Sequence, residues 1–390
     1  MPGVIMRWMR GVAALLVLSL VGSALAEKLS PLEMRRRLGA ETLTAQDVKD
    51  TFGTANDGEM RLDGLDASFA ISASGSAKNA VAFANDNTRF NLRKIGDYFV
   101  GVGTFDPNTA GTITFRVDDR VVGRPRNYEA YLPDPMMRRQ EGVAKGELRA
   151  MGEFRSKNFP GTKREWWVYI PSGLAKNERA NLLVVQDAQW GRDTTAVALD
   201  NLIAAKQMPK TIAVMVTPGE FDDKRSNRSF EYDRLAPGYS SMIIDELLPI
   251  VEKDYKLKTD PADRAIMGNS SGGICAFTAC WLRPENFGVC ISWIGSFVDL
   301  ARLHGDETGG DDYPSLIRKA KVKPIRVFLA DGTRDLENDF GNWPLANRQM
   351  IQALRSMGYD AVFLEGPGFH SGDHLQANLP SALRWAFRGR

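Results

Sequence analysis

One short motif has the residue types of a nucleophile. Gly268-Asn269-Ser270-Ser271-Gly272-Gly273 places Ser270 between glycines in the pattern Gly-x-Ser-x-Gly. A serine at a tight strand-to-helix turn needs small neighbours, because a side chain there would collide with the strand or helix. Ser271 is the rival nucleophile, but Asn269 would then occupy a glycine position. The motif predicts that Ser270 forms an acyl-enzyme and that the Ser271 N–H faces the oxyanion.

A serine hydroxyl needs a base to remove its proton, and the chain has only three histidines. In hydrolases with this motif the chain order is serine, acid, histidine. His370 lies in a glycine-rich loop after the last expected strand and is the favoured base. His374, in the same loop, is the alternative base or a substrate contact. His304 precedes the expected acid, so it is a substrate contact or an exposed loop residue.

The acid is expected in Asp331-Gly332-Thr333-Arg334-Asp335, directly after a strand candidate. Its task is to hold the histidine tautomer and to stabilise the imidazolium. Asp335 lies deeper in the loop and is favoured. Asp331 ends the strand and could instead bind backbone amides in the turn.

A second oxyanion donor normally follows an earlier central strand. The backbone amide of Ala188 or Gln189 is the candidate, since both follow the strand candidate that ends at residue 186. Trp190 would then be a wall of the substrate site or a core aromatic.

Charged residues between 225 and 233 allow two interpretations. Arg225 or Arg228 could meet an anionic or polar substrate at the mouth of the cleft. Alternatively, Arg228, Glu231 and Asp233 pair with one another and fix the loop, which we favour slightly. The Gly- and Asp-rich loop 297–313 is expected to act as a cap that sets specificity.

Apolar, β-prone stretches alternate with helical patterns in the C-terminal part. The strand candidates are 166–170, 181–186, 211–216, 265–267, 289–293, 325–330 and 361–364, and the helical patterns are 240–256, 272–282, 345–356 and 380–387. This alternation predicts a mostly parallel sheet with helices on both faces. Ser270 falls between a strand and a helix, as the motif requires.

Changes in composition along the chain divide it into five segments. Short β-prone pieces between residues 67 and 132, separated by Gly, Asn and Asp, have the spacing of an antiparallel sandwich. The expected segments are a signal peptide at 1–26, an N-terminal segment at 27–62, a β-sandwich at 63–135, a linker at 136–150 and a catalytic domain at 151–390.

Residues 1–26 have the features of a secretory leader. Arg7 and Arg10 precede a short apolar run from 12 to 21, and Ser23-Ala24-Leu25-Ala26 supplies small residues for cleavage. The run is too short for a spanning helix. We therefore expect export to the periplasm or the cell exterior, without a stable membrane span after cleavage; a retained anchor is the alternative.

Composition argues against several classes. With 50 Lys+Arg and 48 Asp+Glu the formal net charge is +2, and no long single-sign block is present, so no nucleic-acid partner is expected. Cys275, Cys280 and Cys290 form an odd set without a CxxC or His/Cys pattern. Buried free thiols, and no metal or organic cofactor, are expected.

Together these motifs resemble the esterase family that includes esterase D, feruloyl esterase modules, enterochelin esterases and mycolyltransferases, and most of all the enterochelin-esterase-like proteins. The resemblance covers about residues 146–390 and rests on 159–162, 167–171, 185–187, 227–233, 268–273, 331–335, 370–374 and 379–385. It implies an α/β-hydrolase fold with Ser270, Asp335 and His370 as the triad. Many members begin with an immunoglobulin-like domain, which the β-prone segment is similar to. Where many relatives have Gly, this chain has Ala188, and a small residue still fits.

The expected function is hydrolysis of a small-molecule or polysaccharide-linked ester, such as a siderophore lactone or a feruloyl or acetyl ester. One alternative is acyl transfer of the mycolyltransferase type, with a sugar hydroxyl in place of water. Another is a binding protein that has lost catalysis, against which the complete set of serine, acid and histidine argues. The pattern carries no indication of an oligomeric state.

Overall fold

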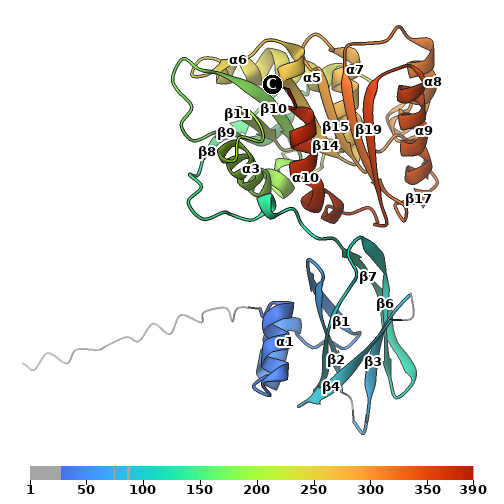
Figure 1. Cartoon of the computed structure of the whole chain (residues 1–390). Coiled ribbons are helices and arrows are strands. Elements are labelled where there is room, and N and C mark those ends of the chain that lie inside the picture. The colour runs from blue at the N-terminus through green and yellow to red at the C-terminus, as the bar shows by residue number, and fades with distance from the viewer. Residues whose placement is uncertain (1–27, 74, 86–87, 390) are drawn as a thin grey trace, which may run out of the picture.

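The computed structural model describes residues 28–73, 75–85 and 88–389, and the expected signal peptide lies outside them. Two large sheets organise this part of the chain, one of seven strands and one of ten. Figure 1 shows the smaller sheet below the larger, with β7 directed toward the larger one. Among the described residues, no helix combines the length and the apolar character needed to cross a membrane.

The N-terminal part is an antiparallel sheet with two helices on one side. Its strands follow the order β1-β2-β5-β4-β3-β6-β7. β4 pairs with β5 through 93–95 and with β3 through 89–92, so it belongs to both halves of the sheet. The elements are α1 (Pro31–Gly39), α2 (Ala45–Phe52), β1 (Glu59–Asp63), β2 (Asp66–Ser72), β3 (Ala80–Ala84), β4 (Arg89–Ile95), β5 (Tyr98–Thr104), β6 (Thr109–Val117) and β7 (Arg120–Ala130).

Alternation of side chains along β2 explains why both faces are covered. Successive residues of a strand point to opposite faces. Phe69 packs with Phe115 in a core shared by strands of both halves. Its neighbour Ala70 packs with Met34 of α1 and Val48 of α2 on the other face. β1 begins in the segment 27–62 and pairs with β2, so the sheet begins before the boundary expected at residue 63.

The C-terminal part is a ten-stranded sheet with helices on both faces. The main strand order is β12-β9-β11-β10-β14-β15-β16-β19. The strands are β8 (Glu147–Phe154), β9 (Thr162–Ile170), β10 (Arg179–Gln186), β11 (Thr211–Val216), β12 (Glu220–Phe221), β13 (Lys256–Leu257), β14 (Arg264–Asn269), β15 (Val289–Trp293), β16 (Arg326–Gly332) and β19 (Asp360–Gly366), with β17 (Glu337–Asn338) and β18 (Gly341–Asn342) as a separate hairpin. The helices are α3 (Ala188–Ala204), α4 (Arg228–Tyr232), α5 (Gly238–Ser241), α6 (Leu248–Val251), α7 (Ser271–Leu282), α8 (Tyr313–Lys319), α9 (Trp343–Ser356) and α10 (Asp373–Ala386), and a π-helical turn at Met242–Leu247 joins α5 to α6.

The central pairings of this sheet are parallel. They join β11 to β10, β10 to β14, β14 to β15, β15 to β16 and β16 to β19, whereas β8 and β9 are antiparallel at one side. Leu182 and Val184 of β10 face the core under α7 and α9, and Leu183 and Val185 face the core under α3 and α10. The carboxyl ends of parallel strands meet at one edge, which is where β14, β15, β16 and β19 deliver the loops of the site.

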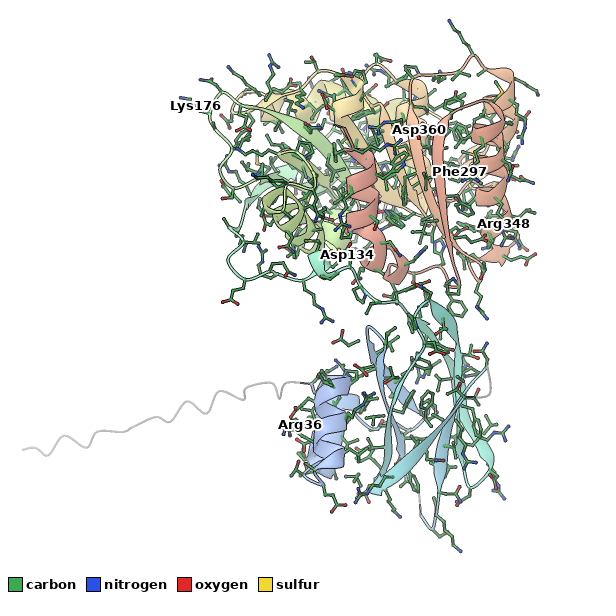
Figure 2. The ribbon with its side chains drawn as sticks, in the orientation of Figure 1. Arg36, Asp134, Lys176, Phe297, Arg348 and Asp360 are labelled. Atoms are coloured by element: carbon green, nitrogen blue, oxygen red, sulfur yellow. The ribbon has the colours of Figure 1, made fainter. Side chains whose placement is uncertain are left out.

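All seven strand candidates of the C-terminal part are present, but several helices differ from expectation. α3, α4 and α8 were not anticipated, and the helix expected at 240–256 includes a π-helical turn and ends at Val251. α10 begins at Asp373 and not at Pro380, and holds this proline inside the helix. Asp134, labelled in Figure 2, donates its N–H to the carbonyl oxygen of Ala377 at 3.2 Å and pairs at 2.7 Å with Arg384 in the last turn of α10. The three cysteines are buried and free, as predicted.

Candidate active site

Ser270 stands at the junction between β14 and α7. Its φ of 58° and ψ of −121° are backbone angles that a non-glycine residue rarely adopts. A Cβ atom on Gly268 would lie 2.5 Å from the carbonyl carbon of Gly272, and one on Gly273 would lie 2.6 Å from Ser292 Oγ of β15. Glycine at these positions therefore allows the close strand-to-helix turn that the motif predicts.

The three residues that the sequence singled out lie in one chain of contacts. His370 Nε2 lies 2.8 Å from Ser270 Oγ, and His370 Nδ1 lies 2.5 Å from Asp335 Oδ1. The Asp335 side chain is fully buried, and Oδ1 also accepts the N–H of Leu336 at 2.5 Å. A carboxylate at Nδ1 holds the tautomer whose Nε2 lone pair faces the serine hydroxyl.

Asp331, the alternative acid, has the backbone role that was considered for it. Its Oδ1 accepts the N–H of Gly332 at 2.8 Å, and its Oδ2 accepts from Asn347 Nδ2 at 3.0 Å. The residue is 1% exposed. Asp331 thus lies behind Asp335 as a second buried carboxyl group.

A second hydroxyl group, which was not predicted from the sequence, lies beside Ser270. Ser296 Oγ lies 3.2 Å from Ser270 Oγ and accepts the indole N–H of Trp343 at 3.1 Å. Trp343 also meets the His370 ring edge-on, with ring centroids 5.9 Å apart. Ser296 follows β15 by three residues, and its position at the edge of the sheet was a usable indication. Trp343 gave none, because its role depends on how α9 packs.

The expected oxyanion donors lie at two helix N-termini. Ser271 is the first residue of α7 and Ala188 the first of α3, and N–H groups in a first helical turn lack partners within the helix. Arg228 joins the two starts: its Nε and Nη2 donate to Asp187 at 2.8 and 2.7 Å, and Nη2 also donates to the Asn269 carbonyl at 3.0 Å. Arg228 therefore fixes the start of α3 against the serine turn.

The favoured pairing among the charges of α4 is wrong. Arg228 binds Asp187, as described, whereas Glu231 pairs with Arg164 at 2.7 Å. Asp233 Oδ2 accepts the hydroxyl of Ser229 at 2.6 Å. The three side chains of α4 and its end contact different parts of the structure. Each buried charge therefore pairs with a group of the element that it contacts, and not with a neighbouring charge in sequence.

Gln189 and Trp190 line the surface beside the site. Trp190 is 68% exposed, which rules out the core interpretation, and the Arg228 guanidinium lies 5.6 Å from its ring centroid. Gln189 borders a polar cleft of about 520 Å³, whose other lining residues are Glu153, Lys163, Arg164, Glu165, Thr217, Pro218, Gly219, Glu220, Lys224 and Ser226.

The other two histidines lie elsewhere. His374 is 5% exposed, and its ring stacks on Tyr131 with centroids 5.1 Å apart. Burial lowers the pKa of His374 to about 4. His304 Nε2 lies 2.9 Å from Ser229 Oγ. His370 is thus the histidine whose ring nitrogen contacts Ser270.

Residues at the end of the N-terminal sheet contact the loop of His370. A Cβ atom on Gly368 would lie 2.1 Å from Glu129 Oε2 and 2.4 Å from Tyr131 Oη. Both side chains are buried, and burial raises the pKa of each. No motif announced these contacts, because the partners are more than 200 residues apart in sequence. Within residues 28–73, 75–85 and 88–389, no cluster of three His, Cys, Asp or Glu side chains is suited to a metal ion.

The part of the chain that holds these residues is similar to known proteins. Residues 156–385 match the model of the family described as "Putative esterase". The chain belongs to this esterase family. Within the family model lie Ser270, Asp335 and His370, whereas the N-terminal sheet lies before it.

Two relatives of this esterase-family chain carry names that include an esterase activity. It is 30% identical over 215 residues to an endo-1,4-β-xylanase/feruloyl esterase of Xylanibacter ruminicola, a match that covers 52% of this chain and 26% of the relative. It is 24% identical over 237 residues to an iron(III) enterobactin esterase of Dickeya dadantii, which covers 58% and 52%. The chain thus spans about a quarter of the first relative and about half of the second.

Solved structures of enterobactin and ferulic acid esterases have the same fold. The enterobactin esterase of Shigella flexneri has a TM-score of 0.60 at 16% identity, covering 85% of this chain and 96% of its own. A ferulic acid esterase of Anaeromyces mucronatus has a TM-score of 0.52 at 18% identity, covering 65% and 96%. The larger share covered by the first means that its likeness extends into the N-terminal sheet.

Proposed function

We propose that this protein is an exported serine esterase that cleaves carboxylic esters through an acyl-enzyme. The observation that carries the proposal is the contact of Ser270 Oγ with His370 Nε2 at 2.8 Å, at a strand-to-helix turn with positive φ. Behind it, His370 Nδ1 lies 2.5 Å from buried Asp335. Such a chain lets the histidine take the serine proton while the carboxylate stabilises the imidazolium. Membership of the esterase family supports the same chemistry.

In the proposed mechanism, Ser270 Oγ attacks the ester carbonyl carbon while its proton passes to His370 Nε2. The carbonyl oxygen becomes an oxyanion, which accepts hydrogen bonds from Ser271 N–H and from Ala188 or Gln189 N–H. The ester C–O bond then breaks, and the departing alcohol takes the proton from His370. Water attacks the acyl-Ser270 carbonyl while His370 accepts a proton from it. The bond from the carbonyl carbon to Ser270 Oγ then breaks, Oγ takes the proton from His370, and the acid is released.

The architecture in this proposal is an α/β-hydrolase domain at 151–390, an immunoglobulin-like sandwich at 63–135 and a leader at 1–26 that directs export. The parallel pairings from β11 to β19 and the antiparallel seven-stranded sheet support the two domains. The names of the relatives suggest aromatic acyl esters of polysaccharide and catecholate siderophore lactones as substrates. The cleft beside Gln189 and exposed Trp190 offers space for the larger part of such a substrate.

The test is a panel of p-nitrophenyl acetate and feruloyl, acetyl and catecholate esters assayed with purified protein. At least one ester is expected to be hydrolysed, and Ser270→Ala should lower kcat by at least about 10⁴-fold. Ser271→Ala is the matched control, because it removes the rival hydroxyl and keeps the backbone N–H. Turnover retained by Ser270→Ala would overturn the proposal. A rate that requires an added sugar acceptor would favour acyl transfer over hydrolysis.

A further inference from the structure

A second buried carboxyl group contacts the acid of the site. Asp331, near the end of β16, is 1% exposed, and its side chain meets that of Asp335, whose side chain is fully buried. The two residues are four positions apart on the loop that leaves the sheet. Catalysis by serine and histidine needs one such carboxylate, so the presence of a second one at this place calls for a physical role.

Hydrogen-bond accounting shows what Asp335 lacks. Its Oδ1 is served twice, by His370 Nδ1 and by the N–H of Leu336, each at 2.5 Å. Its Oδ2 is buried and, within the described part of the chain, has no N–H or hydroxyl partner. The Asp331 carboxyl contacts the Asp335 carboxyl, and Oδ2 is the oxygen of Asp335 left to receive it. A buried acceptor without a donor is costly, so the missing hydrogen is expected on Asp331.

The charges of the two carboxyl groups also indicate that the proton lies on Asp331. Two carboxylates in contact away from water cannot both ionise, so the pair holds one proton. Asp335 faces the imidazole and a backbone N–H. Among the described residues Asp331 forms no ion pair, and Arg348, whose charge acts on it, is bound to Glu365 at 2.6 Å. Burial first, and then the Asp335 carboxylate, raise the pKa of Asp331 to about 10.

We propose that Asp331 is a positioning residue that remains protonated at neutral pH and donates its carboxyl hydrogen to Asp335 Oδ2. This inference rests on the proposed function, because it concerns the acid of that same site. Asn347 Nδ2 and the Gly332 N–H hold the Asp331 carboxyl in place at 3.0 and 2.8 Å. The donated hydrogen fixes the plane of the Asp335 carboxylate, so that Oδ1 stays directed at His370 Nδ1.

Loss of the Asp331 proton at alkaline pH has a defined consequence. Asp335 Oδ2 then faces an anion in place of a donor, and the carboxylate is pushed out of its alignment with His370. The groups around Asp331 are Asp335 and, through it, His370, the uncharged Asn347, Glu365 as its register partner on β19, and Arg348, which binds Glu365. Since Arg348 does not titrate in this range, ester turnover should fall as the pH rises toward 10 because Asp331 ionises.

The experiment compares Asp331→Asn with Asp331→Leu in the full chain, with Asp339→Asn as an exposed control in the same loop. The Asn variant keeps an N–H donor for Asp335 and loses the titration, whereas Leu loses both. We expect Asp331→Asn to stay within about threefold of wild-type kcat at pH 7.5 and to lack the alkaline loss of activity. Asp331→Leu should lower kcat about 10- to 100-fold with little change in KM, as expected for loss of a charge-assisted hydrogen bond to a catalytic group. Asp339→Asn should match wild type throughout.

Two results would overturn the inference. One is an Asp331→Asn enzyme as inactive at pH 7.5 as Asp331→Leu. The other is an alkaline loss of activity that persists in Asp331→Asn. If Asp331→Leu does not fold, the pH profile of Asp331→Asn still decides.

A measurement without turnover separates this inference from the proposed function. In carboxyl ¹³C NMR of the chain labelled at aspartate, the resonance absent from Asp331→Asn should remain that of a protonated acid at pH 8. An ionised Asp331 at pH 8 would contradict the inference even in an active esterase. A protonated Asp331 in a chain that hydrolyses no ester would support it while the proposed function fails.

Discussion

Ser270 and His370 face each other across 2.8 Å, but the two halves of the site are supported in different ways. The serine half is one continuous strand, turn and helix, in which glycines at 268, 272 and 273 set the packing. The histidine half is a loop tied down by other segments. Thr333 N–H donates to the Gly366 carbonyl at 2.8 Å, and Arg334 N–H donates to the Gly368 carbonyl at 2.9 Å.

The histidine loop also depends on the N-terminal sheet. Gly368 packs directly against Glu129, in β7, and Tyr131, the first residue after β7, and Tyr131 stacks on His374. The serine half therefore has its support encoded within a few neighbouring residues. The histidine half is supported by two segments that are distant in sequence. A substitution at the contact between the N-terminal sheet and this loop should therefore displace His370 more than Ser270.

The largest effect is expected from replacement of His370, compared with replacement of His374 at the start of α10. His370→Ala removes the group that contacts Ser270 and should lower kcat by about 10³- to 10⁵-fold. His374→Ala removes a buried ring that has no contact with Ser270, and should act on kcat by less than about tenfold. Steady-state kinetics on the best ester of the panel compares them. A reversed order of the two variants would show that His374 is the base.

A side chain at Gly268 should disrupt the packing of the serine half. In Gly268→Ala the new Cβ lies 2.2 Å from Gln186 Oε1 and 2.5 Å from the Gly272 backbone, so the helix must shift. We expect the free energy of unfolding to fall by about 2–4 kcal/mol, measured by denaturant titration. Gly191→Ala is the control, since its Cβ meets only Thr195 Oγ1 at 3.9 Å. Equal stability of the two variants would contradict the close packing at the turn.

This contrast explains how far the sequence could predict the site. Ser270, Asp335 and His370 were found because chain order and flanking elements restrict each of them. Seven of the ten strands of the large sheet were predicted, because most of these seven are buried parallel strands, which are continuous apolar runs. Trp343 and Asn347 reach the site only through tertiary packing, which no local pattern encodes, whereas the position of Ser296 three residues after β15 was an indication that went unused. The partners of Arg228 and Glu231 were missed for the same reason, since proximity in sequence was a poor guide to buried ion pairs.

The start of α10 was misplaced for a local reason. Pro380 resembles a residue at the beginning of a helix, but it sits inside one that starts at Asp373. Asp134, which lies outside the helix, donates its N–H to the Ala377 carbonyl near this proline.

Burial of His374 should make the stability of the protein depend on pH. The pKa of His374 is lowered by burial to about 4, from 6.5 for an ordinary histidine. Above pH 6.5 the ring is neutral in folded and unfolded chains. Between 6.5 and 4 the unfolded chain takes up a proton that the folded one refuses, so stability is lost as the pH falls.

The loss should approach about 3 kcal/mol near pH 4 and be absent from His374→Phe, which preserves the stack on Tyr131. Glu129 and Asp373, whose pKa values burial raises, are present in both proteins, so the difference between them reports on His374. Parallel stability curves of the two proteins from pH 4 to 7 would show that His374 is not the group responsible.

The smallest effect concerns the contact between the two parts of the chain. Gly368→Ala places a Cβ against Glu129 and Tyr131, whereas Gly372→Ala, in the same loop, meets nothing within 4 Å. The first should lower kcat about tenfold by displacing the His370 loop, and the second should leave kcat unchanged. If both variants behave like wild type, the N-terminal sheet does not position the histidine.

The central claim, that Ser270 carries the acyl group, can be tested by covalent labelling. A fluorophosphonate probe should add one label per chain, and peptide mass spectrometry should place it on Ser270. Labelling should disappear in Ser270→Ala and His370→Ala and persist in Ser271→Ala and Ser296→Ala. A label on Ser271 or Ser296, or an active esterase that takes no label, would contradict the account.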